Sequence, residues 1–243
     1  MIVLAPMAGI CDGDFALKLI PYGFDTITLG GFNIDRPTIL AGKKIIERGR
    51  REFDISVDKI YGFIEAESLK VKEKFPDVNV SVNLRSVNPD SIIEIAKIPS
   101  VDIVEINCHC RQEELQSINC GQAMLKRDDL EDFISSVSNQ TSSKVSVKIR
   151  GNVEGVDDVA ISKMIEDVGC DYLHVDAMNP GVFSADLDLI KRISENTDIF
   201  LIGNNSINSL ENGKAMLNAG ADGISIARAA LKGKLDFNLK DLY

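Results

Sequence analysis

Two groups of side chains in this sequence have types and spacing that can support chemistry. The first gathers three thiols and an imidazole in one short segment: Cys108, His109, Cys110 and Cys120. Such side chains can ligate zinc or an iron–sulfur cluster. Their spacing matches no standard pair of ligand knuckles, and adjacent ligands such as Cys108 and His109 fit one tetrahedron poorly. We therefore expect no metal at this segment.

The second group is a lysine and a histidine in apolar surroundings. Lys148 lies in the run VSVKI, and His174 lies in the run YLHVD. A lysine is rarely buried without a partner or a task, although it can also extend its amine to water at the edge of a sheet. A lone histidine on a strand is often a hydrogen-bonded core residue. The two runs read as neighbouring strands, which favours a shared functional site.

The elements that must position these residues alternate regularly along the chain. The predicted strands are short and apolar, as parallel strands buried on both faces should be: 2–5, 26–29, 79–84, 101–106, 145–149, 172–175, 199–202 and 223–226. The predicted helices are 39–50, 59–74, 91–96, 129–137, 156–168, 187–194 and 209–219. This pattern predicts an α/β fold, a (β/α)8 TIM barrel, with residues 1–243 as one domain. A doubly wound sheet is the alternative, but no early G-x-G-x-x-G motif supports it.

Barrels of this kind carry their working residues at the carboxyl ends of the strands. Those ends are polar here, from Asn83 on the third predicted strand to Arg228 after the eighth. The loops after the last two strands commonly bind phosphate through backbone N–H groups. Gly203 allows close backbone approach there, and Arg228 adds positive potential. The alternative is a glycine turn and a surface arginine.

Composition narrows the class of protein. The chain has 243 residues, 44% of them hydrophobic, and a net charge of −10, which excludes a uniformly basic nucleic-acid binder. A local basic run can still bind phosphates, although a solvated helix face is the simpler interpretation: Lys43, Lys44, Arg48, Arg50 and Arg51. The five cysteines, an odd number without a secretory signal, indicate a reducing cytoplasm. No apolar run is long enough to span a bilayer, so no membrane partner is expected.

Motifs along the chain, in register and in the right order, resemble those of the tRNA-dihydrouridine synthases and their short archaeal TIM-barrel relatives. The opening LAPMAGICDGDF resembles their first strand and loop, and EINCHCRQ resembles their D-I-N-x-G-C-P segment. GQAMLKRDDL, VSVKIR, IGNNSI and GADGISIARAAL continue the resemblance, and YLHV carries the family histidine. The resemblance covers nearly the whole chain.

The resemblance implies an oxidoreductase that uses FMN, with NAD(P)H as the electron source, to reduce a uracil-type C5=C6 double bond. It implies that Cys110 donates a proton to the ring and that Asn107 faces the substrate, with Cys108 as an alternative acid. It implies that Asn83 replaces a flavin-contacting glutamine. The implied FMN-binding residues are Pro6, Met7, Ala8, Asn83, Lys148, His174, Gly203, Asn204, Asn205, Ala227 and Arg228.

The sequence departs from the family pattern on the substrate side. Beside the cysteine, this chain has His109 where the family has a glycine and Arg111 where it has a proline. After the family histidine, this chain has Asp176 within the three positions that read G-R-T in the family. Because the sequence ends at Tyr243, we expect no counterpart of the C-terminal tRNA-binding domain of the longer synthases. The expected substrate is therefore tRNA or a small pyrimidine, the latter as in dihydroorotate dehydrogenases. A non-catalytic flavin protein and a flavin-free phosphate-binding barrel are further alternatives.

Overall fold

Eight strands pair in chain order and close into a parallel barrel, as the alternation of short apolar runs predicts. The computed structural model describes residues 1–242. The strands are β1 (Ile2–Leu4), β2 (Thr26–Asn33), β3 (Asn79–Arg85), β4 (Ile103–Cys108), β5 (Lys144–Arg150), β6 (Tyr172–Asp176), β7 (Phe200–Asn204) and β8 (Gly223–Ile226). Pairing of β1 with β8 closes the ring, so the predicted single-domain TIM barrel is confirmed.

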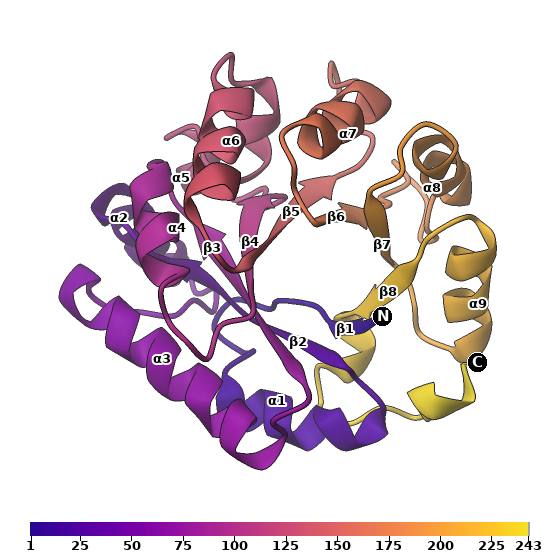
Figure 1. The fold of residues 1–243 in the computed structure, drawn as a ribbon, viewed down its shortest axis with the longest axis horizontal. Helices are drawn as coiled ribbons and strands as arrows, with labels where there is room; N and C mark the ends of the chain where they lie inside the picture. The colour runs from indigo at the N-terminus through magenta and orange to yellow at the C-terminus, as the bar shows by residue number, and fades with distance from the viewer. Residues whose placement is uncertain (243) are drawn as a thin grey trace.

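The helices form an outer ring around the strands (Figure 1). They are α1 (Gly13–Leu19), α2 (Arg36–Glu47), α3 (Val57–Lys74), α4 (Pro89–Ile95), α5 (Glu113–Gln116), α6 (Leu130–Gln140), α7 (Asp158–Asp167), α8 (Leu187–Ser194) and α9 (Leu210–Asn218). Four short 3-10 turns are η1 (Ile20–Tyr22), η2 (Gly121–Lys126), η3 (Arg228–Ala230) and η4 (Leu239–Asp241). Apolar side chains from strands and helices fill one main core between the two rings.

Several predicted boundaries differ from the structure by two or three residues, as for α2 (Arg36–Glu47 against 39–50) and β4 (Ile103–Cys108 against 101–106), and three differences are larger. β2 continues to Asn33, four residues beyond the predicted 26–29, because Gly30, Phe32 and Asn33 still pair with β3 around an irregularity at Gly31. The short helix α1 was not predicted, although Asp12 caps it by accepting a hydrogen bond from the Phe15 N–H at 2.8 Å. The long connection after β4 contains α5 and η2 in addition to the predicted helix. These elements are too short for the helical period to show clearly.

Strand register determines which polar side chains share the barrel interior. Asn83 is paired with Glu105, and Lys148 is paired with both Asn107 and His174. Residues in register on parallel strands lie on the same face of the sheet. All five side chains are buried, and the contacts described below join them across the barrel. The fold thus places a polar layer under the mouth, the end where the strands' carboxyl termini meet.

Within residues 1–242, no helix is both long and apolar enough to cross a membrane.

Candidate active site

A chain of hydrogen bonds, here called the inner polar network, crosses the barrel beneath its mouth. Asn107 Nδ2 donates to Asn83 Oδ1 at 2.7 Å, and Asn83 Nδ2 donates to Glu105 Oε1 at 2.8 Å. Glu105 Oε2 lies 2.7 Å from His174 Nδ1, and His174 Nε2 lies 2.6 Å from Lys148 Nζ. Four of the residues predicted to form the site, Asn83, Asn107, Lys148 and His174, are therefore brought together.

Proton positions in this network follow from its donors and acceptors. Burial and the nearby charge of Lys148 lower the pKa of His174, so its ring is neutral at pH 7. The Glu105 carboxylate can only accept, so His174 Nδ1 carries the proton and Nε2 offers its lone pair. Lys148 Nζ and the Ser225 hydroxyl share this acceptor, at 2.6 and 2.5 Å from His174 Nε2. Positive charge on Lys148 and negative charge on Glu105 thus lie on either side of a neutral imidazole.

Glu105 is a site residue to which sequence reasoning gave no role. Its side chain is 2% exposed and also accepts the Ser146 hydroxyl at 3.1 Å. Burial favours the protonated acid, but the hydrogen bond with His174, the charge of Lys148 and the hydrogen bond from Asn83 lower the pKa of Glu105 to about 2. Burial in turn lowers the pKa of Lys148 to about 8. The sequence feature that could have identified Glu105 is its place inside the apolar run VDIVEINC, because a buried carboxylate is rare without a partner.

Cys110 is held at the mouth by its backbone. The Asn107 side-chain oxygen accepts the N–H groups of His109 and Cys110, at 3.1 and 2.9 Å. The Cys110 carbonyl accepts the Gln122 N–H at 2.8 Å. Gly121 is required beside it, because its φ is +64° and a Cβ there would lie 2.4 Å from the Cys110 oxygen. Asn107 therefore connects the Cys110 loop directly to the inner polar network.

Cys110 differs from the other four cysteines in exposure. It is partly exposed, whereas Cys11, Cys108, Cys120 and Cys170 are buried. Burial raises the pKa of each of these four thiols. Cys108 Sγ faces Met124 Sδ at 4.0 Å. Within residues 1–242, no three His, Cys, Asp or Glu side chains are grouped so that they could hold a metal ion.

A second polar group, the mouth cluster, joins His109, Arg150, Asp176 and Asn205. Asp176 Oδ2 lies 2.7 Å from His109 Nε2 and 3.2 Å from Arg150 Nη2. Asn205 Nδ2 donates to Asp176 Oδ1 at 2.6 Å. His109 and Asp176, two positions where the sequence departs from the family pattern, are thus direct partners.

The mouth cluster predicts a pH dependence of stability. Burial lowers the pKa of His109 to about 4, and the positive charges of Lys148 and Arg150 lower it further. The hydrogen bond and charge of Asp176 act in the opposite direction. Between pH 6.5 and 4 the unfolded chain binds a proton at His109 that the folded chain does not, so stability falls as pH falls. Between pH 6.5 and 4, we expect the free energy of unfolding of the His109→Gln variant to fall by about 2 kcal/mol less than that of the parent, as measured by urea unfolding. Parallel curves for the two proteins would contradict this, and His174 remains in both as the internal control.

The end of β1 lies beside the end of β8, because the Ala5 N–H donates to the Ile226 carbonyl at 2.9 Å. Pro6, Met7 and Ala8 follow in a tight turn, in which the Met7 carbonyl accepts the N–H groups of Ile10 and Cys11. No side-chain hydrogen bond within residues 1–242 joins this turn to the inner polar network. The turn and Ala227 are therefore adjacent at the rim of the mouth.

Arg85, at the end of β3, is a second residue to which the sequence gave no role. Its side chain is 5% exposed and forms an ion pair with Glu52 at 2.7 Å. Glu52 belongs to the connection between α2 and α3, and its backbone packs so closely on Gly9 that a Cβ there would lie 2.6 Å from the Glu52 nitrogen. This connection therefore contacts both the turn after β1 and the end of β3.

The loops after β7 and β8 offer backbone donors. Within residues 1–242, the N–H groups of Asn205, Ser206, Arg228 and Ala229 have no acceptor. Arg228 is exposed and forms no ion pair with any described residue. Gly203 has a packing role, because a Cβ on it would lie 2.5 Å from Met216 of α9. Its predicted contact with a phosphate is a separate matter and stays a prediction.

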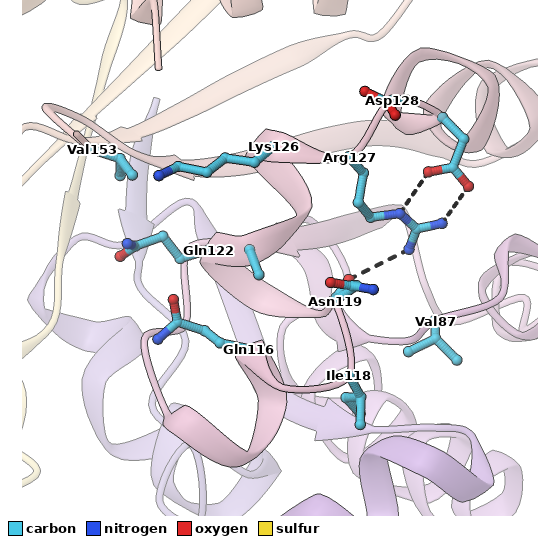
Figure 2. A pocket seen from close by; sticks show the side chains of 11 residues that line it. Val87, Gln116, Ile118, Asn119, Gln122, Lys126, Arg127, Asp128 and Val153 are labelled. Carbon is cyan, nitrogen blue, oxygen red and sulfur yellow. Dashed lines mark hydrogen bonds and ion pairs between the residues drawn. The ribbon is translucent and has the colours of Figure 1, made fainter. Parts of the chain in front are cut away.

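A surface cavity of about 770 Å³ lies beside the Cys110 loop, not within the mouth. Val87, α5, η2 and Val153 line it, and Figure 2 shows Gln116, Gln122 and Lys126 along one side. Arg127 on the other side is held by Asp129 at 2.6 and 2.7 Å. None of the residues predicted to bind FMN lines this cavity.

The sequence is similar to those of several known proteins. An uncharacterised protein of Methanocaldococcus jannaschii is 38% identical, over 99% of this chain and 93% of its own. The tRNA-dihydrouridine synthase B of Vibrio vulnificus is 24% identical over 94% of this chain. A tRNA-dihydrouridine(20) synthase of Schizosaccharomyces pombe is 23% identical over 98% of it. This chain spans 67% of the Vibrio enzyme and 52% of the Schizosaccharomyces enzyme.

Among solved structures, a thiamine phosphate pyrophosphorylase from Pyrococcus furiosus aligns with a TM-score of 0.59. Its identity is 14%, and the alignment covers 99% of this chain and 94% of the other, so the likeness concerns the barrel fold alone. A family profile described as dihydrouridine synthase matches residues 55–233, which include the inner polar network and the Cys110 loop. The chain therefore belongs to the dihydrouridine synthase family of flavin-dependent oxidoreductases.

Proposed function

We propose that this protein binds FMN at the mouth of the barrel and reduces a uracil-type C5=C6 double bond, with NAD(P)H as the electron source and Cys110 as the proton donor. The observation that carries the proposal is the attachment of a partly exposed cysteine to a buried, charged polar network. Asn107 makes that attachment by accepting the Cys110 N–H while donating to Asn83. Bound FMN supplies hydride transfer, which no amino-acid side chain provides.

The residues present fit the phosphate and the ring of FMN. The unpartnered N–H groups after β7 and β8, with Arg228 beside them, match a phosphate. Asn204 ends β7 and Asn205 follows it, while β8 lies between β7 and β1, the strand that leads into the turn of Pro6, Met7 and Ala8. Lys148, in contact with the neutral His174, holds positive charge beneath the mouth, where it can stabilise an electron-rich ring edge. Asn83 keeps an amide that both donates and accepts.

Cys110 is the acid we assign to the chain itself. A thiol can donate its proton to the ring carbon C5 as a general acid. Cys108, the alternative, is buried against Met124, which argues for Cys110. Asn107 positions the Cys110 loop, and the neutral His174 keeps the Lys148 charge in place through its Nε2 lone pair.

Uridine in tRNA is the proposed substrate, because the relatives from Vibrio and Schizosaccharomyces are named tRNA-dihydrouridine synthases. Lys43, Lys44, Arg50 and Arg51 are exposed and available to RNA phosphates. Arg48 forms an ion pair with Glu114 at 2.5 Å instead. A free pyrimidine is the second candidate, since the net charge of −10 and the Asp176 carboxylate at the mouth disfavour a polyanion.

The visible absorption spectrum of the purified protein, with mass spectrometry of the released ligand, tests the cofactor. We expect a flavin spectrum and FMN at about one per chain. A colourless protein that does not bind added FMN would support the alternative of a flavin-free phosphate-binding barrel. Incubation of the FMN-loaded protein with NADPH and unmodified tRNA, or with uridine monophosphate, then identifies the substrate by detection of the dihydrouracil product.

The Arg228→Ala variant tests the phosphate end of the site. Removing one charged donor should raise the Kd for FMN about tenfold, the effect of a charge-assisted hydrogen bond. Fluorescence titration of the FMN-free protein measures it. Lys232→Ala is the matched control, because Lys232 is an exposed cation only four residues further along the chain. Equal affinities in the two variants would remove Arg228 from the site.

A further inference from the structure

The mouth cluster is built from the carboxyl ends of four consecutive strands of the barrel. His109 follows β4, Arg150 ends β5, Asp176 ends β6, and Asn205 follows β7. Asp176 is 6% exposed and accepts from all three partners. The His109 side chain is 26% exposed, so part of its ring faces open space at the mouth. The proposed function assigns no task to this ring.

The partners of His109 decide which of its nitrogens carries the proton. Its Nε2 lies 2.7 Å from Asp176 Oδ2 and 3.1 Å from Arg150 Nη2. If Nε2 were unprotonated, two acceptor atoms would face each other at hydrogen-bond distance. With a proton on Nε2, the ring donates to Asp176, and Arg150 donates to the same carboxylate at 3.2 Å. The Nε2–H tautomer is therefore the one that satisfies the cluster.

This tautomer leaves a lone pair on Nδ1. No residue within 1–242 donates to Nδ1. The fully buried side-chain N and O atoms without a partner are Thr28 Oγ1, Arg85 Nε and Asp158 Oδ1, so Nδ1 of His109 is not buried in that way. His174 is different, because both of its nitrogens already have partners inside the barrel. His109 thus presents an open hydrogen-bond acceptor in the residue immediately before Cys110.

We propose that His109 is a substrate-positioning residue, whose Nδ1 accepts a hydrogen bond from a ring N–H of the substrate while Asp176 fixes the tautomer. The proposal rests on the proposed function, because a uracil ring carries one such group, the imide N3–H between two carbonyls. A single acceptor aimed at that group selects a pyrimidine with a free imide and orients its C5 edge relative to Cys110. It also rejects a ring alkylated at N3, because the acceptor then faces a methyl group.

Nitrogen-15 NMR of the FMN-loaded protein labelled at histidine tests the tautomer. The chain contains only two histidines, so His109→Gln assigns the spectrum directly. We expect a proton on Nε2 of His109 and on Nδ1 of His174. A proton on Nδ1 of His109 would overturn the proposal before any ligand is added.

Two probes then test recognition: uridine 5′-monophosphate and its N3-methyl analogue. We expect uridine monophosphate to move the His109 Nδ1 resonance to lower frequency, the methylated probe to leave it unchanged, and the parent to prefer the former about tenfold. In His109→Gln, which still offers Asp176 a donor, this preference should fall to near one. A merely structural role would change both affinities together and leave their ratio intact.

The outcomes separate this inference from the proposed function. Binding of uridine monophosphate without any response at Nδ1 contradicts the inference and leaves the substrate class standing. Failure to bind either probe or an unmodified tRNA contradicts the substrate class and the inference with it.

Discussion

Replacement of Cys110 by alanine is expected to lower the rate of dihydrouracil formation by about 10²- to 10⁴-fold, the usual range for loss of a general acid. The thiol is the partly exposed member of the five cysteines, and Asn107 fixes its backbone at the mouth. The side chain itself makes no hydrogen bond within residues 1–242, so its loss should disturb little else. The amount of FMN retained after purification should therefore equal that of the parent.

Cys108→Ala is the control for this experiment. Cys108 is two residues away and fully buried, so the variant should keep most of its turnover while losing some stability from the small cavity left beside Met124. Product formation is measured by mass spectrometry of the pyrimidine after incubation with NADPH. Unchanged turnover in Cys110→Ala would exclude the thiol as the acid, and a loss in Cys108→Ala alone would transfer that role.

The predicted site residues on strands were accessible to sequence reasoning because strand periodicity is local. A polar residue in an apolar run, such as Lys148 in VSVKI, must point either into the barrel or into the helical layer. The fold class then says which end of the strand carries chemistry. Asn83, Lys148 and His174 were identified in this way, with the family resemblance, and the structure joins them in one network.

The partnerships within the site were not accessible, because they join residues distant in sequence. His109 and Asp176 are 67 residues apart, and Glu105 and His174 are 69 apart. Such pairs depend on the stagger between strands when the barrel closes, which no local pattern encodes. The same holds for Glu52 and Arg85, since the path of the connection after α2 is set by its packing on Gly9.

Glu105→Gln is expected to lower the free energy of unfolding by about 3–5 kcal/mol, the cost of removing one partner of a buried ion pair. The amide keeps the size of the side chain but removes the charge that faces Lys148 across His174. It also presents an NH₂ group where the carboxylate accepts from Asn83, Ser146 and His174. Urea unfolding at pH 7 measures the loss. Glu94→Gln is the control, because Glu94 of α4 pairs with Lys97 just beyond the helix, both side chains are exposed, and the change should alter stability by less than about 0.5 kcal/mol.

The pH dependence of this loss shows whether uncompensated charge is its cause. Glu105 raises the pKa of Lys148 against the effect of burial, so its removal should drop that pKa below about 8. A folded-state lysine pKa below the unfolded value destabilises most at low pH, and the penalty fades as pH rises past the folded pKa. The deficit of Glu105→Gln should therefore be larger at pH 6 than at pH 9. Adding Lys148→Met should cost less in the variant than in the parent, with a coupling of about 1–3 kcal/mol. Additive losses and a deficit independent of pH would mean that Glu105 stabilises the barrel through shape and hydrogen bonds alone, and that the contact with His174 is enough to hold Lys148.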